Sequence, residues 1–267
     1  MISPDAFYVS DGGVFVSSEL TRGPWDPGAQ HAGPPAALIA REVERATEPD
    51  WQVGRITYEI LRPVPIAPLR VEVEVRRPGR SVELLAAMLT DADGEPLITA
   101  SVWRIATQDT EIPAELDTSS DAVPGPDRGR TKDFFDTGQA VGYHTAMEYR
   151  FVAGGFTDLG PALVWMRPRY PLVAGEEMTP LQRVMIAADS GNGVSATLDL
   201  DRYIFINVDL SVHLHRLPQG EWIGLDAVTL PEPEGIGLAD SVLHDERGPI
   251  GRALQTLLVR ERQPVRA

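Results

Sequence analysis

The chain has 267 residues, which is long enough for two ordinary domains, since a globular domain takes roughly 150 residues. Its hydrophobic fraction of 43% supports a substantial core, and its net charge of −15 argues against nucleic acid or an anionic membrane as a partner. The absence of cysteine excludes disulfides, thiolate metal sites and a cysteine nucleophile. No apolar run is long enough for a membrane span, and the first residues lack the features of a secretory signal, so we expect a cytoplasmic protein.

The first half of the sequence predicts a single helix followed by an antiparallel sheet. Two short strands, near residues 6–10 and 14–17, precede a helix over residues 31–46, which opens on Gly33 and two prolines that suit the first helical positions. Runs rich in β-forming residues then predict four hairpin-connected strands, at residues 53–61, 69–77, 81–90 and 96–104. One helix packed on a strongly curved sheet would bury the apolar faces of both.

The second half predicts the same arrangement after an irregular segment. Residues 107–142 are acidic, contain proline and lack periodicity, which is typical of a linker. A strand at 162–167 comes next, and Thr179 with Gln182 forms a capping-box pattern at the start of a helix. Further strands are predicted at 204–215, 222–230, 238–243 and 250–260. We therefore expect an α+β protein with domains at residues 1–106 and 143–267, joined by the linker 107–142.

Two short anchors repeat at one fixed offset. Arg62 and Arg216 each follow an apolar alternating run, and they lie 154 residues apart. Gly94 and Gly248, each in the turn before a strand, are also 154 residues apart. A constant offset between two turn-and-strand anchors indicates a duplicated domain.

Four segments give the chain a family resemblance: HAGPPAAL at residues 31–38, LRPVP at 61–65, ADS at 188–190 and HLHR at 213–216. Together with the two helix-and-sheet copies, they resemble the double-hotdog acyl-CoA thioesterases of the thioesterase II type. The resemblance covers nearly the whole chain except the linker. It implies a tandem hotdog fold, and hydrolysis of a fatty-acyl-CoA to free acid and CoA by water, without a cofactor or metal.

The resemblance places three catalytic residues in the second copy: Asp189 at the end of the helix, Asn207 on the next strand and Gln255 on the last strand. The family often has threonine at the position of Asn207, but an amide can still donate and accept hydrogen bonds. A carboxylate in the last turn of a helix opposes the macrodipole, so Asp189 needs a compensating reason. The structural alternatives are a polar turn that ends the helix for Asp189, and solvent-facing strand positions for Asn207 and Gln255.

The repeat predicts one active site in each chain. Subtracting 154 from the three positions gives Pro35, Val53 and Ser101, so the first copy should lack the carboxylate and both amides. We expect the first copy to contribute scaffold and substrate-binding groups, including His31 and Gly33. Backbone N–H groups at the start of its helix could hold an oxyanion or a phosphate.

Other activities are compatible with parts of the sequence. Asp26 and His31 have the spacing of hotdog enoyl-CoA hydratases, although the Asn-Pro pair found between them in those enzymes is absent. His213 and His215 share a strand face and could bind a metal, but no third ligand is evident. A non-catalytic acyl-binding module on the same fold is a further alternative.

The expected assembly is a homodimer or a larger even homo-oligomer. The linker supplies the pairing between two hotdogs that single-hotdog enzymes obtain by dimerisation. Sheet edges remain open after this pairing, and exposed edges are generally protected or paired further.

Overall fold

The computed structural model describes residues 5–46, 50–113 and 122–262. The first copy contains six strands, one short 3₁₀ turn and one long helix: β1 (Tyr8–Asp11), β2 (Val14–Ser17), η1 (Glu19–Thr21), α1 (Gly33–Arg45), β3 (Trp51–Ile60), β4 (Pro68–Arg77), β5 (Val82–Thr90) and β6 (Pro96–Ala106). The order of elements matches the sequence prediction, and the boundaries agree within a few residues.

The second copy repeats this arrangement with additional elements. After η2 (Pro126–Arg128) its elements are α2 (Tyr143–Ala146), β7 (Met147–Gly155), β8 (Asp158–Pro168), α3 (Pro180–Ala188), α4 (Gly191–Val194), β9 (Tyr203–Asn207), β10 (Asp209–Leu214), β11 (Ile223–Pro231), β12 (Ile236–Asp245) and β13 (Gly248–Glu261). Strand β7 was missed in the sequence analysis, and the strand predicted at 204–215 is two strands. The polar turn named as the alternative for Asp189 leads directly into the short helix α4.

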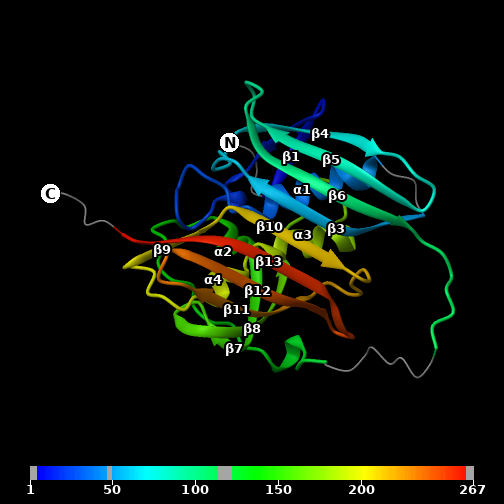
Figure 1. Cartoon of the computed structure of the whole chain (residues 1–267). Coiled ribbons are helices and arrows are strands. Elements are labelled where there is room, and N and C mark those ends of the chain that lie inside the picture. Colours follow the sequence, from blue (N-terminus) through cyan, green and yellow to red (C-terminus); the bar gives the residue numbers. More distant parts are fainter. Residues whose placement is uncertain (1–4, 47–49, 114–121, 263–267) are drawn as a thin grey trace.

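The two copies share one continuous antiparallel sheet of 13 strands, in the order β1-β2-β4-β5-β6-β3-β10-β13-β12-β11-β8-β7, with β9 paired to β13. They meet where β3 pairs with β10 (Figure 1). At this seam the Ser211 hydroxyl lies 3.1 Å from the hydroxyl of Thr57. These residues are 154 positions apart, so each is the repeat counterpart of the other. The seam therefore lies on the axis that relates the two copies.

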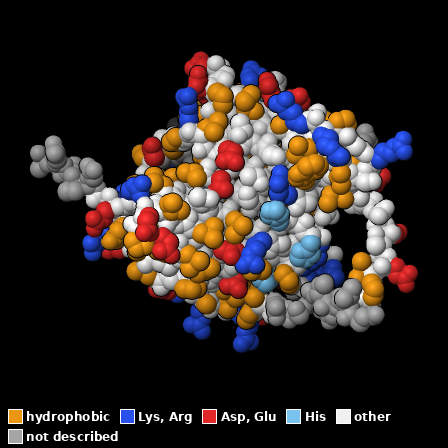
Figure 2. Space-filling view, viewed as in Figure 1, with side chains coloured by type: hydrophobic (Ala, Val, Ile, Leu, Met, Phe, Trp, Pro, Cys, Tyr) orange, Lys and Arg blue, Asp and Glu red, His pale blue; other side chains and the backbone are white. Residues whose placement is uncertain are grey.

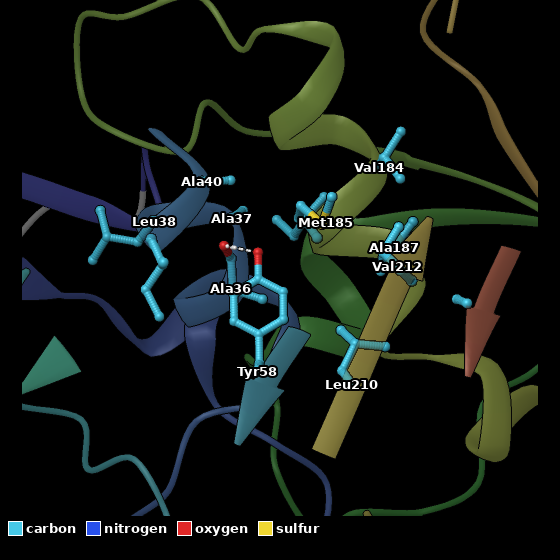
Figure 3. Packing of buried hydrophobic residues seen from close by; sticks show 14 of the residues in the cluster. Ala36, Ala37, Leu38, Ala40, Tyr58, Val184, Met185, Ala187, Leu210 and Val212 are labelled. Carbon is cyan, nitrogen blue, oxygen red and sulfur yellow. Dashed lines mark hydrogen bonds between the residues drawn. The ribbon is translucent and has the colours of Figure 1, made fainter. Parts of the chain in front are cut away.

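The two long helices pack against each other on the inner side of the sheet. Small side chains of α1, Ala36, Ala37 and Ala40, face Met185 of α3, and Val184 lies beyond it (Figure 3). All five residues are buried, and side chains as small as alanine let the two backbones approach closely. Burial of this interface holds the ends of both helices in fixed positions.

The helices run antiparallel, so each helix ends where the other begins. Near the start of α1, a Cβ on Gly33 would lie 2.3 Å from the Ile186 carbonyl oxygen of α3. Near the start of α3, the Thr179 hydroxyl donates to Glu44 in the last turn of α1, at 2.8 Å. Each helix end is consequently a place where residues of both copies meet.

The structure describes residues 107–113 and 122–142 of the predicted linker. The second of these parts, which precedes α2, packs against the second copy. Arg130 and Phe151 of β7 exchange two backbone hydrogen bonds of 2.9 Å. The Trp165 indole N–H donates to the carbonyl of Pro124 at 2.8 Å. This segment therefore has a fixed position beside the candidate site.

Candidate functional site

Asp189 caps the C-terminal end of α3 and is nearly inaccessible, with a relative exposure of 5%. Burial raises the pKa of its carboxyl from 3.8 to about 7. Hydrogen bonds from Asn207, Gln255 and the amides of Ala32 and Gly33 oppose this rise. Desolvation is the larger effect, so this carboxyl changes its protonation near neutral pH, which suits a general base.

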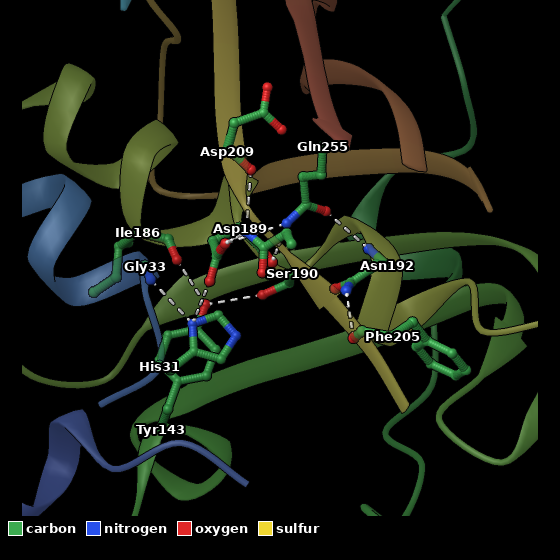
Figure 4. A network of polar contacts seen from close by, with 11 residues as sticks. His31, Gly33, Tyr143, Ile186, Asp189, Ser190, Asn192, Phe205, Asp209 and Gln255 are labelled. Atoms are coloured by element: carbon green, nitrogen blue, oxygen red, sulfur yellow. Dashed lines mark hydrogen bonds and ion pairs between the residues drawn. The ribbon is translucent and has the colours of Figure 1, made fainter. Parts of the chain in front are cut away.

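Asn207 reaches Asp189 from the end of β9. Its Nδ2 donates to Asp189 Oδ1 at 2.8 Å and to the carbonyl of Asp209 at 3.2 Å; both of these partners are labelled in Figure 4. Asn207 opposes Leu257 of β13, whereas Ser211 opposes Leu254, so four steps on one side match three on the other. The extra residue is a β-bulge, a device that redirects a side chain. It explains why the strand predicted at 204–215 is divided.

Gln255 lies inside the protein, with 2% exposure, and not on the solvent-facing side of β13. Its Nε2 donates to the backbone carbonyl of Asp189 at 3.0 Å and to Oδ1 of the same residue at 3.2 Å. Its Oε1 accepts from the amide of Asn192 at 3.0 Å. Since both hydrogens and the oxygen are in use, the geometry makes Gln255 a residue that positions Asp189.

Gly191 keeps this arrangement compact. A Cβ at this position would lie 3.0 Å from Gln255 Oε1 and 2.7 Å from the hydroxyl of Ser241. Real Cβ atoms essentially never show a contact of 2.7 Å, and 3.0 Å is tighter than most, so the glycine allows α4 to approach β12 and β13. The glycine-rich segment after Asp189 thus serves the site as well as ending α3.

His31 and Gly33 bring the first copy to Asp189. His31 Nδ1 lies 3.1 Å from Asp189 Oδ2, and its ring stacks on Tyr143 with centroids 3.7 Å apart. Burial lowers the pKa of His31 to about 3, so the imidazole is neutral at physiological pH. The two residues therefore do not form a full ion pair, and a single proton between Nδ1 and Oδ2 makes their contact favourable.

The start of α1 points its free amides at Asp189. The N–H of Gly33 donates to His31 Nδ1 at 3.1 Å (Figure 4). The N–H groups of Ala32 and Gly33 also lower the pKa of the Asp189 carboxyl. The next two residues, Pro34 and Pro35, have no N–H. The helix start predicted to hold an oxyanion thus has its available donors directed at His31 and at the carboxyl of the other copy.

Tyr143 supports this cluster from α2. Its hydroxyl donates to the Ile186 carbonyl at 2.6 Å and lies 3.0 Å from the hydroxyl of Ser190. The sequence analysis gave no role to Tyr143, which belongs to no motif, or to Ser190, which it quoted only within the segment 188–190. The contact of Tyr143 with His31 and Ser190 becomes visible only in the fold.

The repeat counterpart of Asp189 is not Pro35, as the constant offset implied. The helices begin at residues 33 and 180, 147 positions apart, so the offset of 154 holds for strands β3–β6 but fails for the helices. With the helix offset of 147 the counterpart of Asp189 is Glu42, and the last turn of α1 also carries Glu44, which accepts from Thr179 Oγ1 at 2.8 Å and Gln182 Nε2 at 3.0 Å. Pro35 therefore gives no support to the prediction that the first copy lacks a carboxylate at the equivalent place, whereas Val53 and Ser101 remain at the other two positions.

The alternative sites are less well assembled. The Asp26 carboxylate accepts from the Gly28 amide at 2.8 Å, closing its own exposed turn, and the carboxyl beside His31 is that of Asp189. His213 and His215 are exposed. Among residues 5–46, 50–113 and 122–262, no group of three or more potential ligands is placed to hold a metal ion. No helix in these ranges is long and apolar enough to cross a membrane.

The fold and the site define a double-hotdog protein whose polar cluster joins both copies. Residues 21–105 match the family model for the acyl-CoA thioesterase N-terminal domain, and residues 119–259 match that for the C-terminal domain. The chain belongs to the acyl-CoA thioesterase family. No curated protein matches its sequence significantly.

Solved structures share the fold at low sequence identity. A provisionally named thioesterase II from Thermobifida fusca is 18% identical, with 95% of each chain covered and a TM-score of 0.73. A conserved protein of unknown function with a hot dog fold from Alicyclobacillus acidocaldarius is 16% identical, with 98% of each chain covered and a TM-score of 0.72. The acyl-CoA thioesterase II TesB2 from Mycobacterium marinum is 17% identical, with 95% of each chain covered and a TM-score of 0.67.

Proposed function

We propose that this protein is a thioester hydrolase that cleaves an acyl-CoA to free acid and CoA, with Asp189 as the general base. The observation that carries the proposal is the convergence of Asn207, Gln255, His31 and two backbone amides on one buried carboxyl. Its pKa of about 7 lets the carboxylate accept a proton from water at neutral pH and return it later. Family membership supplies the acyl-CoA substrate class.

In the proposed reaction, water attacks the thioester carbonyl while Asp189 takes one of its protons. The tetrahedral intermediate collapses by breaking the C–S bond, and the CoA thiolate receives the proton from Asp189. Asn207 and Gln255 hold Oδ1 in place, and Oδ2, which contacts His31, is the oxygen proposed to take the proton from water. Such preorganisation lowers the barrier because the base needs no reorientation during the reaction.

The test is hydrolysis of a panel of acyl-CoA thioesters of graded chain length, followed by detection of the free thiol. We expect turnover by the wild type and its loss in Asp189→Asn. Binding of acyl-CoA without release of thiol by any member would instead support the acyl-binding module. Hydration of an enoyl-CoA that depends on Asp26 would support the hydratase alternative.

We also propose that the chain forms a homodimer or a larger even homo-oligomer. The outer face of the second copy carries exposed apolar residues on adjacent strands: Ile206, Leu230, Ile236, Leu238 and Leu258. Hydrophobic side chains gather among charged ones over β12 and β13 (Figure 2), and a sizeable exposed apolar patch is typical of an interaction surface. Sedimentation at micromolar concentration should give at least twice the chain mass of 29.1 kDa, and a monomer would contradict the proposal.

A further inference from the structure

A small pocket opens beside the candidate site. Its polar side is formed by His31, Ser190 and Asn192, and its volume is about 40 Å³. His31 contacts Asp189, and Asn192 contacts Gln255, so this pocket is continuous with the polar cluster. Most of the remaining wall is aromatic: Trp25, Phe134, Phe135, Tyr143, Tyr149 and Phe156.

Two of these rings come from the segment between the hotdog copies. The Phe135 ring stacks on Trp25, with centroids 5.4 Å apart. Phe134 lies 4.3 Å from Phe135 and 4.3 Å from Phe156 between centroids, in tilted arrangements. Phe134 therefore packs between the linker and β7–β8, where it forms part of the pocket wall.

The segment that carries these rings is attached at both ends. Upstream, Arg130 pairs with Phe151 of β7 through two backbone hydrogen bonds. Downstream, the Arg22 guanidinium donates to the Val141 carbonyl at 3.1 Å, and the amide of Tyr143 donates to the Arg22 carbonyl at 2.9 Å. The aromatic wall is thus part of the packed structure, and moving it would disrupt contacts with both copies.

We propose that this pocket receives the acyl group and that Phe134 and Phe135 end it, which makes the protein selective for short-chain acyl thioesters. The inference rests on the proposed hydrolase function and adds its substrate class. The polar side beside Asp189 takes the thioester carbonyl, and the aromatic side takes the alkyl chain. By comparison, an apolar cavity that holds benzene has a volume of about 150 Å³. The pocket, at about 40 Å³, is less than a third of that volume, so only the shortest acyl groups enter it without displacing the two rings.

The experiment measures kcat/KM for acetyl-, butanoyl-, octanoyl- and dodecanoyl-CoA with the wild type and with Phe134→Ala. We expect the wild type to favour butanoyl-CoA over dodecanoyl-CoA by at least tenfold. In Phe134→Ala the space vacated by the ring should raise kcat/KM for dodecanoyl-CoA about tenfold, with no gain for acetyl-CoA. Phe134→Leu, which preserves more of the packing, should shift the preference in the same direction and replaces the alanine variant if that variant fails to fold.

Trp103→Leu is the matched control, because it removes a half-buried aromatic side chain from β6, outside the pocket lining. It should leave the chain-length preference unchanged. Equal or better hydrolysis of dodecanoyl-CoA by the wild type would overturn the inference while leaving the proposed hydrolase intact. So would an unchanged preference in a folded Phe134 variant.

A second measurement separates this inference from the proposed function. If the wild type hydrolyses no thioester, the proposed function fails, and the pocket is tested by calorimetry with non-hydrolysable S-butyl-CoA and S-dodecyl-CoA. Tighter binding of S-butyl-CoA by the wild type, together with improved binding of S-dodecyl-CoA by Phe134→Ala, would support the pocket assignment. Equal or tighter binding of S-dodecyl-CoA by the wild type would overturn it.

Discussion

Replacing Asp189 with asparagine should remove activity and stabilise the fold at alkaline pH. The folded-state pKa of Asp189 is raised to about 7, whereas an unfolded aspartate titrates near 3.9. Between these values the native protein binds more protons than the unfolded chain, so its stability falls as pH rises. The destabilisation is absent below about pH 4, grows by about 1.4 kcal/mol per pH unit and reaches about 4 kcal/mol above pH 7.

Asparagine fits the contacts of the protonated carboxyl. Its Oδ1 can accept from Asn207 and Gln255, and its Nδ2 can donate to His31 Nδ1 at the position of Oδ2. The variant therefore keeps most of the network but carries no buried charge. We expect the wild type to lose about 3 kcal/mol relative to Asp189→Asn between pH 5 and pH 8.

Urea unfolding of both proteins at the two pH values measures this difference. Asp226→Asn is the control, because it removes an exposed carboxylate of β11 and should show no such pH dependence. In parallel, kcat of Asp189→Asn should fall by roughly 100-fold or more, and wild-type activity should rise through pH 7. A constant stability difference between wild type and Asp189→Asn across this range would refute the assignment of a buried, ionising base.

The remaining predictions concern the support of the site and its counterpart. Gln255→Leu leaves the amide of Asn192 without its acceptor and should cost about 1–3 kcal/mol in urea unfolding, with a fall in kcat; unchanged kinetics would exclude its positioning role. Gly33→Ala forces a methyl group against the Ile186 carbonyl and should cost about 1–3 kcal/mol, so an unaltered melting temperature would contradict the close approach. Glu44→Gln should retain hydrolysis and binding of one S-butyl-CoA per chain by calorimetry, whereas loss of activity would assign catalysis to the first copy.

The sequence predicted the strands well where turn-forming residues flank a run of alternating polar and apolar residues. Strands β4, β5 and β6 are hairpin-connected and begin within one residue of the predicted positions. Strand β7 was missed because only the short helix α2 separates it from the irregular segment, without a turn signal. The division between β9 and β10 was missed because a bulge depends on the register with β13, which a single strand's sequence does not contain.

The sequence identified individual residues of the candidate site but not the contacts between them. Asp189, Asn207 and Gln255 were located through the family resemblance, and the structure brings them together. The contact of His31 with Asp189 joins residues 158 positions apart across the helix pair, so no local pattern could reveal it. The repeat counterpart of Asp189 was misplaced at Pro35 because the repeat offset differs between helices and strands.

The seam between β3 and β10 has a consequence for folding of the nascent chain. Tyr58 and Leu210 are paired across it, so β3 lacks this neighbour until about 150 further residues have been synthesised. While β3 remains unpaired, its edge exposes N–H and C=O groups to other chains. Contacts between residues so far apart in the sequence also slow folding. The first hotdog thus emerges with an open edge that only the second hotdog closes, and efficient production of the protein depends on how fast synthesis delivers β10.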